Sequence, residues 1–599
     1  MIRCNKTQRQ GRIKTWVCVV EGYRPGPGLA PKQRTIKSFG YLEDQPDPEA
    51  FMEEVREFNA HYKDGVERRI DVASNSMMYS TENRRQNYGY KFLQAIYDRL
   101  GINGFIARDV KTRKQRKGKE LGDIFRLLVL MRILAPGSKR AASRVQDNFY
   151  GMATKFSLAD IYRALDRIAG LETGLQCHLN EAVKGFIGRD LSYAFYDVTN
   201  CFFEIDFPDA EGGLRQRGVS KEHRVDPIVG LGLLMDANGL PVGMTVFPGN
   251  TSEATTLEPA LRDVKLAYGL GRLVVVADKG LNSSCNINMI TNAGDGFVIS
   301  QPLRGTKGKR YQERLFDPSG YIENADGSYR YKIFDEEYDG LDATGGKVKR
   351  MRRVLLYWNR SDAARTRQKR EEKLKKAERA VRNGVSAIKR GASAYIKEET
   401  VVRLTGECLE SPQIKKIRSV DMAKAEQDAL FDGYSCIITS ELDFGEAQIR
   451  SAYKGLWRIE QSFRIMKSDL YVRPVFVWTE AHIRAHFLIC FTALLIVRII
   501  QHLMEEEALS AARIATALSA ATCQVLKGGI IHLDDVGGML AFKKAQNAKG
   551  EFVETLEFSD EDQIASDYKR IQNTFGTDFY NIYPRQEVFN KFLNGIAVS

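Results

Sequence analysis

The sequence has 599 residues, which is enough for several domains, and 43% of them are hydrophobic. With 28% charged residues and no excess of Pro or Gly, its composition is that of a globular protein and excludes a fibrous or largely disordered chain. The 89 Lys and Arg outnumber the 76 Asp and Glu, and the net charge of +13 favours a polyanionic partner, most simply nucleic acid.

The N-terminus and the cysteines indicate a soluble protein of a reducing compartment, so we expect a cytoplasmic, nucleoid-associated location. The first residues, MIRCNKTQRQGRIK, have no apolar core and are not a secretory signal. The nine Cys are scattered without a CxxC pair, which argues against structural zinc. The longest apolar run, residues 487–497, is too short to span a bilayer, so we expect a buried helix and no membrane partner.

The N-terminal region, residues 1–86, is predicted to contain a β-hairpin, a short helix and a linker. Apolar-rich runs in TWVCVVEGYR and KQRTIKSFGYL are separated by the loop PGPGLAP, which indicates two paired strands. Residues 48–63 have a helical pattern, and residues 64–86 are polar, as in a linker.

Residues 87–188 are predicted to form a helical domain. Apolar residues recur at spacings of three and four in YKFLQAIYDRLG, ELGDIFRLLVLMRIL and LADIYRALDRIAG. Six of the nine residues from Lys111 to Lys119 are basic, and a second basic cluster contains Lys139, Arg140 and Arg144. These clusters suit a domain that binds DNA ends, although a solvated charged face explains them equally well.

Residues 189–301 change to the order strand, strand, strand, helix, strand, helix, strand, which predicts the mixed sheet of a ribonuclease-H-like α/β core. The fourth strand, GRLVVVAD, is almost continuously apolar, as expected when both faces of a strand are buried. The first helix of this region is expected to begin at Thr251 or Ser252 as the N-cap. In this order Asp197 lies in the middle of the first strand, and Asp278 lies at the C-terminal end of the fourth.

Residues 302–430 break this pattern, and we expect an inserted domain that is not part of the sheet. It contains short strand-like pieces and a helix, residues 365–382, with nine basic and three acidic residues. Residues 431–505 are predicted to return to the core with a strand, the helix that carries Glu460 and the buried apolar helix. Residues 506–599 form a C-terminal region that is helical at first and has no predicted role.

The stretch from Ser451 to Arg473 has the pattern of one amphipathic helix. Tyr453, Glu460 and Lys467 recur every seven residues, so they are predicted to share one face. A metal-dependent phosphoryl-transfer site needs such a set, because the Glu binds a cation and the Lys binds a phosphate near it. The alternative is a surface helix with ion pairs such as that between Glu460 and Arg464.

Asp197, Asp278 and Glu460 are the candidate catalytic and metal-binding residues. An Asp in the middle of an apolar strand is difficult to explain without a function, whereas an Asp at a strand end, taken alone, is more often a turn or cap residue. Phosphodiester chemistry with two Mg²⁺ or Mn²⁺ ions, about 4 Å apart, requires a cluster of carboxylates. We therefore expect an enzyme that carries out DNA phosphoryl transfer with two such ions as cofactors.

Other residues have weaker claims to a functional role. His482 and His486 have the i,i+4 spacing of zinc ligands, but a packed or hydrogen-bonded pair is the favoured interpretation. Trp358 suits stacking on a flipped base or, more simply, packing in the protein. One loop holds three residues that either contact the DNA backbone or are solvated, namely Ser220, Lys221 and Arg224.

Several motifs in order resemble the DDE transposases of bacterial insertion sequences. They are YDVTN, PGN at residues 248–250, VVVADKG, and the seven-residue spacing of Tyr453, Glu460 and Lys467. The likeness is to the insertion-sequence-four group and more narrowly to its sixteen-thirty-four branch, which the block RGVSKEHRVDPIVGLGLLMDANGLPVGMTVFPGN also resembles. It covers roughly residues 90–505, and the long gap between Asp278 and Glu460 accommodates the inserted domain of that family.

The resemblance implies roles for the residues that match. Asp197, Asp278 and Glu460 would be the metal-binding catalytic triad. Tyr453 and Lys467 match the Tyr/Arg/Glu/Lys signature of the group, in which these residues hold the phosphates of the transposon end.

The Arg of that signature would fall at position 456, where this sequence has Leu456. Arg464, on the same predicted face as Glu460, or Arg458, on a different face, would have to replace it in DNA binding.

The resemblance also implies DNA partners and a reaction. It implies cleavage at the terminal inverted repeats, strand transfer of a 3′-hydroxyl into target DNA, and a homodimer in the synaptic complex. Two alternatives stay open: a ribonuclease-H-like nuclease that hydrolyses DNA without joining it, and a catalytically inactive relative that only binds DNA as a regulator.

Overall fold

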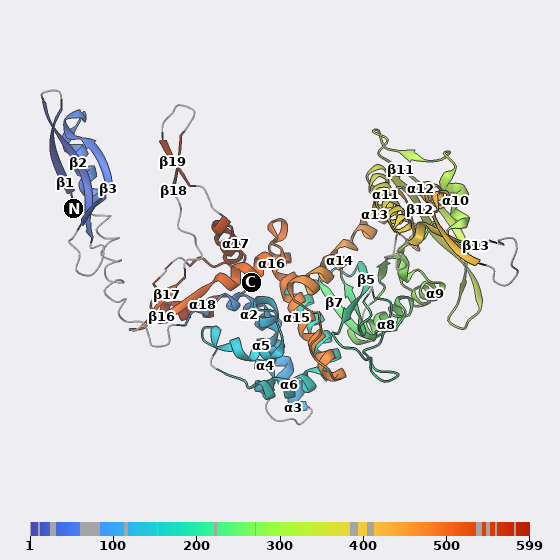
Figure 1. Ribbon diagram of the computed structural model, residues 1–599. Helices are drawn as coiled ribbons and strands as arrows, with labels where there is room; N and C mark the ends of the chain where they lie inside the picture. The colour runs from blue at the N-terminus through green and yellow to red at the C-terminus, as the bar shows by residue number, and fades with distance from the viewer. Residues whose placement is uncertain are drawn as a thin grey trace. The chain divides into compact units, whose positions relative to one another are not determined.

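The structure is a computed structural model of the chain (Figure 1). It describes residues 2–9, 12–23, 32–59, 84–112, 118–152, 154–220, 224–269, 271–383, 393–403, 413–526, 528–534, 542–546, 552–556, 560–579, 581 and 583–598. The chain divides into two compact units. The first contains residues 1–85, 523–534 and 581–591, and the second contains residues 86–522, 535–580 and 592–599.

The first unit is built on a three-stranded antiparallel sheet, β1 (Ile2–Arg9), β2 (Arg12–Tyr23) and β3 (Lys32–Tyr41). β2 and β3 pair where the sequence predicts a hairpin, and β1 adds a strand that the sequence analysis did not predict. A helix over residues 48–59 packs Val55 against the buried valines of β2. Most of the predicted linker lies outside the described residues.

The second unit contains the helical region that the apolar spacing predicts. Gly101, which follows the first of its helices, has φ +64°, a conformation that glycine adopts without strain. The helices are α2 (Tyr90–Arg99), α3 (Ile102–Thr112), α4 (Gly118–Leu134), α5 (Lys139–Val145), α6 (Leu158–Ala169) and α7 (Glu172–Ile187).

The same unit holds a large mixed sheet, in which a central run of strands has the order β7-β6-β5-β8-β9. β5, β6 and β7 form an antiparallel meander, and β8 and β9 continue the sheet in parallel with β5. The elements along the chain are β5 (Tyr193–Phe202), β6 (Ile228–Met235), β7 (Pro241–Pro248), α8 (Leu257–Tyr268), β8 (Val274–Ala277), α9 (Ser284–Asn292) and β9 (Gly296–Ser300).

This sequence of elements is the predicted one, with one difference at the start of α8. A 3₁₀ turn, Glu253–Thr255, precedes the helix. Ser252 stands at the N-cap position of this turn and Thr256 at that of α8, so the predicted N-cap of Thr251 or Ser252 is wrong for the α-helix itself. One large core, which includes Tyr196, Val275 and Phe297, packs α8, α9 and α10 (Lys309–Phe316) against the sheet.

The expectation that residues 302–430 lie outside the sheet is wrong for three strands. β10 (Ile322–Glu323), β11 (Tyr329–Leu341) and β12 (Lys347–Asn359) extend the sheet, because β12 pairs with β15 (Tyr434–Thr439), which in turn pairs with β9. β11 and β12 contain many charged residues, because much of this long hairpin is partly exposed. Their sequence therefore lacks the apolar pattern that would predict strands of the main sheet.

The remaining elements of that segment are not strands of the main sheet. They are α11 (Arg360–Arg382), the two-stranded sheet of β13 (Ile396–Arg403) and β14 (Gln413–Val420), and α12 (Met422–Ala429).

The helix α15 (Glu480–Leu503) is buried, as the apolar run predicts. It packs against α4 and α6 of the helical region and against β7 of the sheet, and Figure 1 shows it between these parts. Among the described residues it is the one helix that is long and apolar enough to cross a membrane, and 89% of its apolar window is buried inside the protein.

The predicted single helix over residues 451–473 is wrong in detail. The chain forms α13 (Glu446–Lys454), a turn at residues 455–456, α14 (Trp457–Arg464) and a π-helical stretch, η7 (Ile465–Asp469). The turn brings the backbone of Gly455 against the ring of Phe195, so closely that a Cβ atom at residue 455 would lie 2.2 Å from the Phe195 Cζ.

The C-terminal region contributes two helices to the second unit, α16 (Ala511–Ala520) and α17 (Asp560–Thr574). Arg513 of α16 donates to Asp567 of α17 at 2.8 Å, and the Tyr568 ring packs on Phe92 of α2 with ring centroids 5.8 Å apart. The other elements in this region are β16 (Thr522–Leu526), β17 (Ile530–Leu533), β18 (Phe542–Gln546), β19 (Phe552–Leu556) and α18 (Gln586–Gly595).

Candidate active site

Asp197 lies on β5, between β6 and β8 in the sheet. Its neighbours along the strand, Tyr196 and Val198, are buried, whereas Asp197 itself is half-buried. The Val198 backbone N–H donates to Asp197 Oδ1 at 2.7 Å. The carboxylate is therefore held at the surface of the sheet, where it keeps access to solvent.

Asp278 directly follows β8, and the sheet register aligns it with Asp197. β5 and β8 are parallel, with Phe195 paired to Val276. Asp197 and Asp278 each come two residues later, so both side chains leave the same face of neighbouring strands at the same level. This alignment brings together two residues that are 81 positions apart in the sequence.

Glu460 reaches the same place from the first turn of α14. Ile459 and Phe463 of this helix are buried, whereas Glu460 is exposed on another face. Gly455, just before α14, lies against Phe195 of β5, two residues from Asp197. The contact between this turn and β5 fixes the position of Glu460 relative to the sheet.

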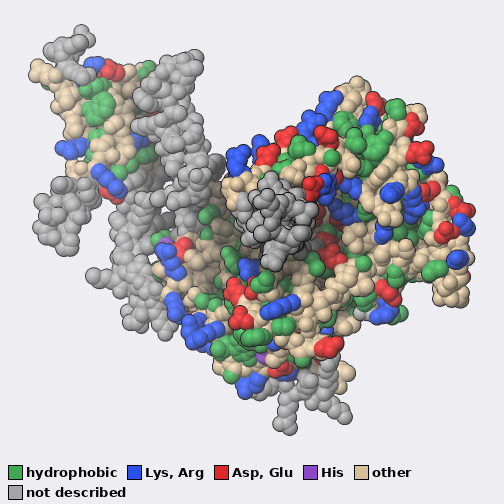
Figure 2. All heavy atoms as spheres, turned by 45° about the vertical axis from the view of Figure 1, so that its right-hand side comes forward, with side chains coloured by type: hydrophobic (Ala, Val, Ile, Leu, Met, Phe, Trp, Pro, Cys, Tyr) green, Lys and Arg blue, Asp and Glu red, His purple; other side chains and the backbone are tan. Residues whose placement is uncertain are grey.

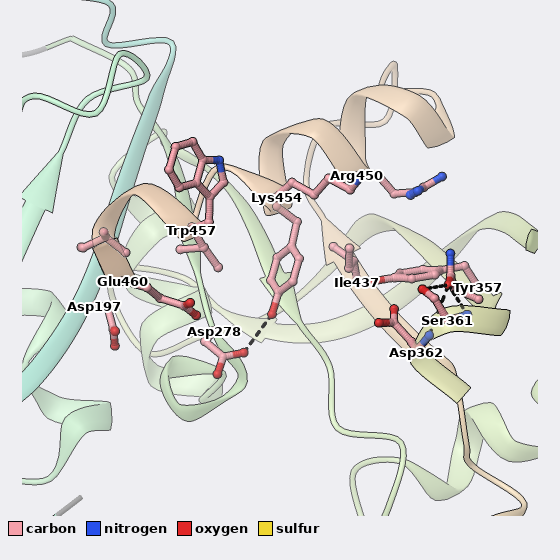
Figure 3. Close-up of a pocket in the computed structure, with 14 residues that line it drawn as sticks. Asp197, Asp278, Tyr357, Ser361, Asp362, Ile437, Arg450, Lys454, Trp457 and Glu460 are labelled. Atoms are coloured by element: carbon pink, nitrogen blue, oxygen red, sulfur yellow. Dashed lines mark hydrogen bonds between the residues drawn. The ribbon is translucent and has the colours of Figure 1, made fainter. Parts of the chain in front are cut away.

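One pocket of about 490 Å³ is lined by all three carboxylates and by Tyr453. Figure 3 shows the carboxyl groups of Asp197, Asp278 and Glu460 at one end of this pocket. The Tyr453 hydroxyl donates to Asp278 Oδ1 at 2.9 Å. Burial and then the charge of Asp278 raise the pKa of Tyr453, so its hydroxyl stays protonated and can orient that carboxylate.

The donor set suits a hard divalent cation, since Mg²⁺ and Mn²⁺ prefer carboxylate oxygens and water. In the described part of the chain, however, no group of three His, Cys, Asp or Glu side chains has the spacing of a formed metal site. The three acids thus line a common pocket and would have to draw together around an ion.

The other end of the pocket contains residues that the sequence analysis did not single out. Arg450 and Lys454 of α13 are one helical turn apart, and Tyr357, Asn359, Ser361 and Asp362 come from β12 and the start of α11 (Figure 3). Arg450 is held by Glu446 at 2.8 Å and lies over the Tyr329 ring at 4.1 Å, whereas Lys454 is exposed. In the sequence, the i,i+4 spacing of Arg450 and Lys454 could have indicated that these two basic residues share one face of a helix.

Trp457 also lines the pocket and was missed by the sequence analysis. It lies four residues after Tyr453 and three before Glu460, which is helical spacing. The side chain is 53% exposed, which is unusual for a tryptophan. An exposed aromatic ring beside basic side chains can stack on a nucleic-acid base.

The predicted common face of Tyr453, Glu460 and Lys467 is only partly present. Lys467 lies in the π-helical stretch, and it is not among the residues that line the pocket in the described part of the chain. The seven-residue spacing requires one continuous α-helix, whereas the turn at residues 455–456 and the π-helix change the rotation per residue.

The two candidate replacements for the signature Arg also lie away from this pocket. Arg464 is exposed at the end of α14, and its charge acts on Asp469. Arg458 packs beside Gly239 and lies 5.5 Å from the centroid of the Trp457 ring. Neither of them is among the described residues that line the pocket.

The histidines and Trp358 have contacts that account for them without a metal or a base. His482 Nε2 lies 3.0 Å from Asp166 Oδ1, and His486 Nε2 lies 3.0 Å from the Val472 carbonyl oxygen. The Trp358 indole N–H donates to the Asp432 carbonyl at 3.0 Å.

The predicted DNA contacts outside the pocket have mixed outcomes. Arg224 lies over the Phe202 ring at 3.8 Å, Ser220 is buried, and Lys221 lies outside the described residues. Lys139 is buried, so it cannot contact DNA as predicted, whereas Arg140 and Arg144 are exposed. Most of the basic segment from Lys111 to Lys119 lies outside the described residues.

One family model matches part of the chain. Residues 218–496 match the family model described as a transposase DDE domain, which supports a DDE transposase family. The matched segment contains Asp278 and Glu460 and begins after Asp197.

No curated protein matches the chain. A solved structure, the cryo-EM structure of a piggyBac transposase synaptic complex with hairpin DNA, matches 74% of this chain and 82% of that chain. The sequence identity is 8% and the TM-score is 0.32.

Proposed function

We propose that this protein is a DNA transposase that cleaves DNA at the ends of an insertion sequence and joins the freed 3′ ends to target DNA. The observation that carries the proposal is the convergence of Asp197, Asp278 and Glu460 on one pocket, within a chain that matches a transposase DDE domain. Three acids from two strands and a helix, far apart in the sequence, line this pocket, and metal-dependent phosphoryl transfer requires such a set of carboxylates.

In this proposal Asp197, Asp278 and Glu460 hold two Mg²⁺ or Mn²⁺ ions. Bound ions would stabilise charge on the attacking and leaving oxygens of the phosphodiester. Tyr453 fixes the orientation of the Asp278 carboxylate through its hydrogen bond. Arg450 and Lys454 offer positive charge to DNA phosphates at the other end of the pocket, and Trp457 offers a ring on which a base can stack.

The proposal extends to the kind of element and to the assembly. The motifs YDVTN, VVVADKG and PGN support the insertion-sequence-four group and its sixteen-thirty-four branch. We propose a homodimer that binds two terminal inverted repeats, and a cytoplasmic location at the nucleoid. Lys467, Arg464 and Arg458 lie outside the pocket, so in this proposal they contact DNA farther from the scissile phosphate.

Two other functions use the same residues. A nuclease would hydrolyse DNA and join nothing, and an inactive relative would bind DNA as a regulator. The retained set of three carboxylates favours an enzyme, because a protein that only binds DNA gains nothing from acidic side chains beside phosphates.

The first test follows a labelled 3′ end. Purified protein, DNA carrying the terminal repeats of the element and a target plasmid are incubated with Mg²⁺. The proposal predicts cleavage at the repeat end and a slower-migrating product in which the label is joined to the plasmid. Cleavage without a joined product would identify a nuclease, and binding without cleavage would identify a regulator.

Glu460→Gln tests the catalytic role of the helix carboxylate. The amide keeps the shape and removes the charge, so we expect normal binding to repeat-end DNA and at least a hundredfold loss of cleavage, as a rough estimate for a lost metal ligand. The matched control is Glu480→Gln, which removes an exposed Glu that pairs with Arg484 and should leave cleavage unchanged. Cleavage by Glu460→Gln at the wild-type rate would exclude this role.

A further inference from the structure

Arg498 of the buried helix α15 bonds directly to the helix that carries Glu460. Its guanidinium donates to the Ser462 hydroxyl at 2.7 and 3.1 Å and to the Arg458 carbonyl at 3.0 Å. A third acceptor on α14 is the Gln461 side-chain oxygen, at 3.0 Å. One side chain of the core thus bonds to three residues of α14, namely Arg458, Gln461 and Ser462.

These acceptors are all neutral, and no carboxylate is among the bonds that the described residues make with Arg498. The residue is only 8% exposed. Burial, and then the nearby charge of Arg458, lower the pKa of Arg498 to about 10. Burying a cation without a counter-charge is unfavourable, and an apolar side chain would fill such a site at lower cost.

The held face of α14 lies opposite Glu460. Residues of an α-helix are separated by 100°, so residues 458 and 462, two positions to either side of Glu460, lie about 160° away from it. The bonds from Arg498 therefore fix the rotation of α14 about its axis without approaching the pocket. A helix that rotated or slid would move the Glu460 carboxylate relative to Asp197 and Asp278.

The chain that follows the Glu460 helix is held in a similar way. His486 of α15 bonds to the Val472 carbonyl at 3.0 Å, and Arg132 of α4 donates to the Leu470 and Tyr471 carbonyls at 3.4 Å. Buried basic side chains thus hold backbone or neutral groups on both sides of η7.

We infer that Arg498 is a positioning residue for Glu460, which sets the rotation of α14 so that the carboxylate can share metal ions with Asp197 and Asp278. This inference rests on the proposed function for its metal site. Arg498 is not among the described residues that line the pocket, and we infer that it affects metal affinity and the chemical step but not DNA binding.

The test compares Arg498→Met with Arg352→Met. Arg352 is also a buried arginine, on β12, but it pairs with Glu336 at 2.7 Å and lies outside the pocket. Each variant is measured for thermal stability, for Mn²⁺ binding to the protein without DNA by electron paramagnetic resonance, for repeat-end binding without metal, and for cleavage. Arg498→Lys, which keeps the charge and can donate to fewer of the acceptors, is the conservative variant.

We expect Arg498→Met to weaken Mn²⁺ binding by 10- to 100-fold, a typical cost of removing a group that orients a ligand, and to lower the cleavage rate by about 100-fold. Repeat-end binding should stay within about twofold of the wild type, and Arg498→Lys should recover part of the loss. Arg352→Met should lower the melting temperature and leave Mn²⁺ affinity unchanged.

If Arg498→Met binds Mn²⁺ as Arg352→Met does, the positioning role is wrong. If Arg498→Met does not fold, the comparison of Arg498→Lys with wild type decides in the same way. A wild-type protein that binds Mn²⁺ through Glu460 but does not cleave DNA would overturn the proposed function and leave this inference standing, because the metal measurement contains no DNA.

Discussion

Single residues in this protein carry charge where the surrounding chain is apolar. Asp197 stands on a strand whose neighbours are buried, and its carboxylate stays accessible because it faces the pocket rather than the core. Tyr453 is half-buried, and its hydroxyl donates to Asp278 at 2.9 Å. At this scale the site consists of acids that a bound cation would stabilise, beside a hydroxyl that stays protonated.

Lys139 is the other unusual residue, since its ammonium group is buried beside further basic side chains. Its Nζ lies 3.4 Å from His486 Nδ1, and burial together with the charge of Arg132 lowers the pKa of Lys139 to about 7. The Cys490 thiol has a smaller effect in the opposite direction on the pKa of Lys139, and burial raises the pKa of Cys490 itself.

The pH dependence of stability follows from this shift. An unfolded lysine has a pKa near 10.4, as a reference value. Between about pH 7 and pH 10 the unfolded chain binds a proton that the folded protein has released, so Lys139 makes folding more favourable as the pH rises. The slope is at most about 1.4 kcal/mol per pH unit, and below pH 7 the folded protein has to bury the charge.

Lys139→Met should therefore change how the melting temperature depends on pH. Relative to the wild type, the variant should be most stable at or below pH 7 and should lose that advantage steadily toward pH 10. Differential scanning fluorimetry across this range measures the difference. Lys184→Met, at an exposed position of α7, is the control and should differ from the wild type by a constant amount.

At the scale of elements, the break between α13 and α14 decides where the site residues point. Gly455 lies at the break with an ordinary helical φ of −53°, so glycine is needed there for space and not for conformation. A Cβ atom would meet the buried ring of Phe195 at 2.2 Å and 2.5 Å. The close approach of this turn to β5 links the level of Glu460 to the level of Asp197.

Gly455→Ala should overpack this contact. We expect a loss of about 1–3 kcal/mol in the free energy of unfolding, together with slower cleavage, because α14 has to move away from β5. Denaturant unfolding and the cleavage assay measure the two effects. Gly445→Ala is the matched control at the start of α13, where an added Cβ has no neighbour closer than 3.8 Å, and it should change neither.

At the scale of the whole molecule, the sequence has a net charge of +13. Figure 2 shows Lys and Arg side chains interspersed with Asp and Glu over the visible face. Many of these charges form ion pairs, as between Arg353 and Asp335 at 2.7 Å. If the proposed function is correct, Arg450 and Lys454 at the pocket are the basic residues closest to the three carboxylates among those that line it.

Binding to repeat-end DNA should nevertheless depend strongly on salt. Each phosphate neutralised by a Lys or Arg releases counterions, so a protein with six or more phosphate contacts should lose about a thousandfold in affinity between 50 and 200 mM salt. Fluorescence anisotropy without metal measures the slope. Glu460→Gln should have the same slope as the wild type, and a salt-independent affinity would contradict a phosphate-dominated interface.

The sequence by itself determined the local pattern of this protein. The spacing of apolar residues predicts the helices α2, α4, α6 and α15 and the order of elements from β5 to β9. It does so because an element that buries one face, or all of its surface, has apolar residues at regular positions. The isolated Asp197 in an apolar strand indicates a function for the same reason, since an unexplained charge there is costly.

Only the tertiary structure decided which residues meet. The extension of the sheet by β10, β11 and β12 depends on pairing with β15, far along the chain, and partly exposed strands leave a weak apolar pattern. The π-helix after α14 separates Lys467 from Glu460, and the contact of Gly455 with Phe195 sets the position of α14 against β5. Residue spacing in the sequence predicts neither feature. Arg450, Lys454 and Trp457 enter the pocket, and Lys139 enters the core, because packing at long range sets the orientation of each element.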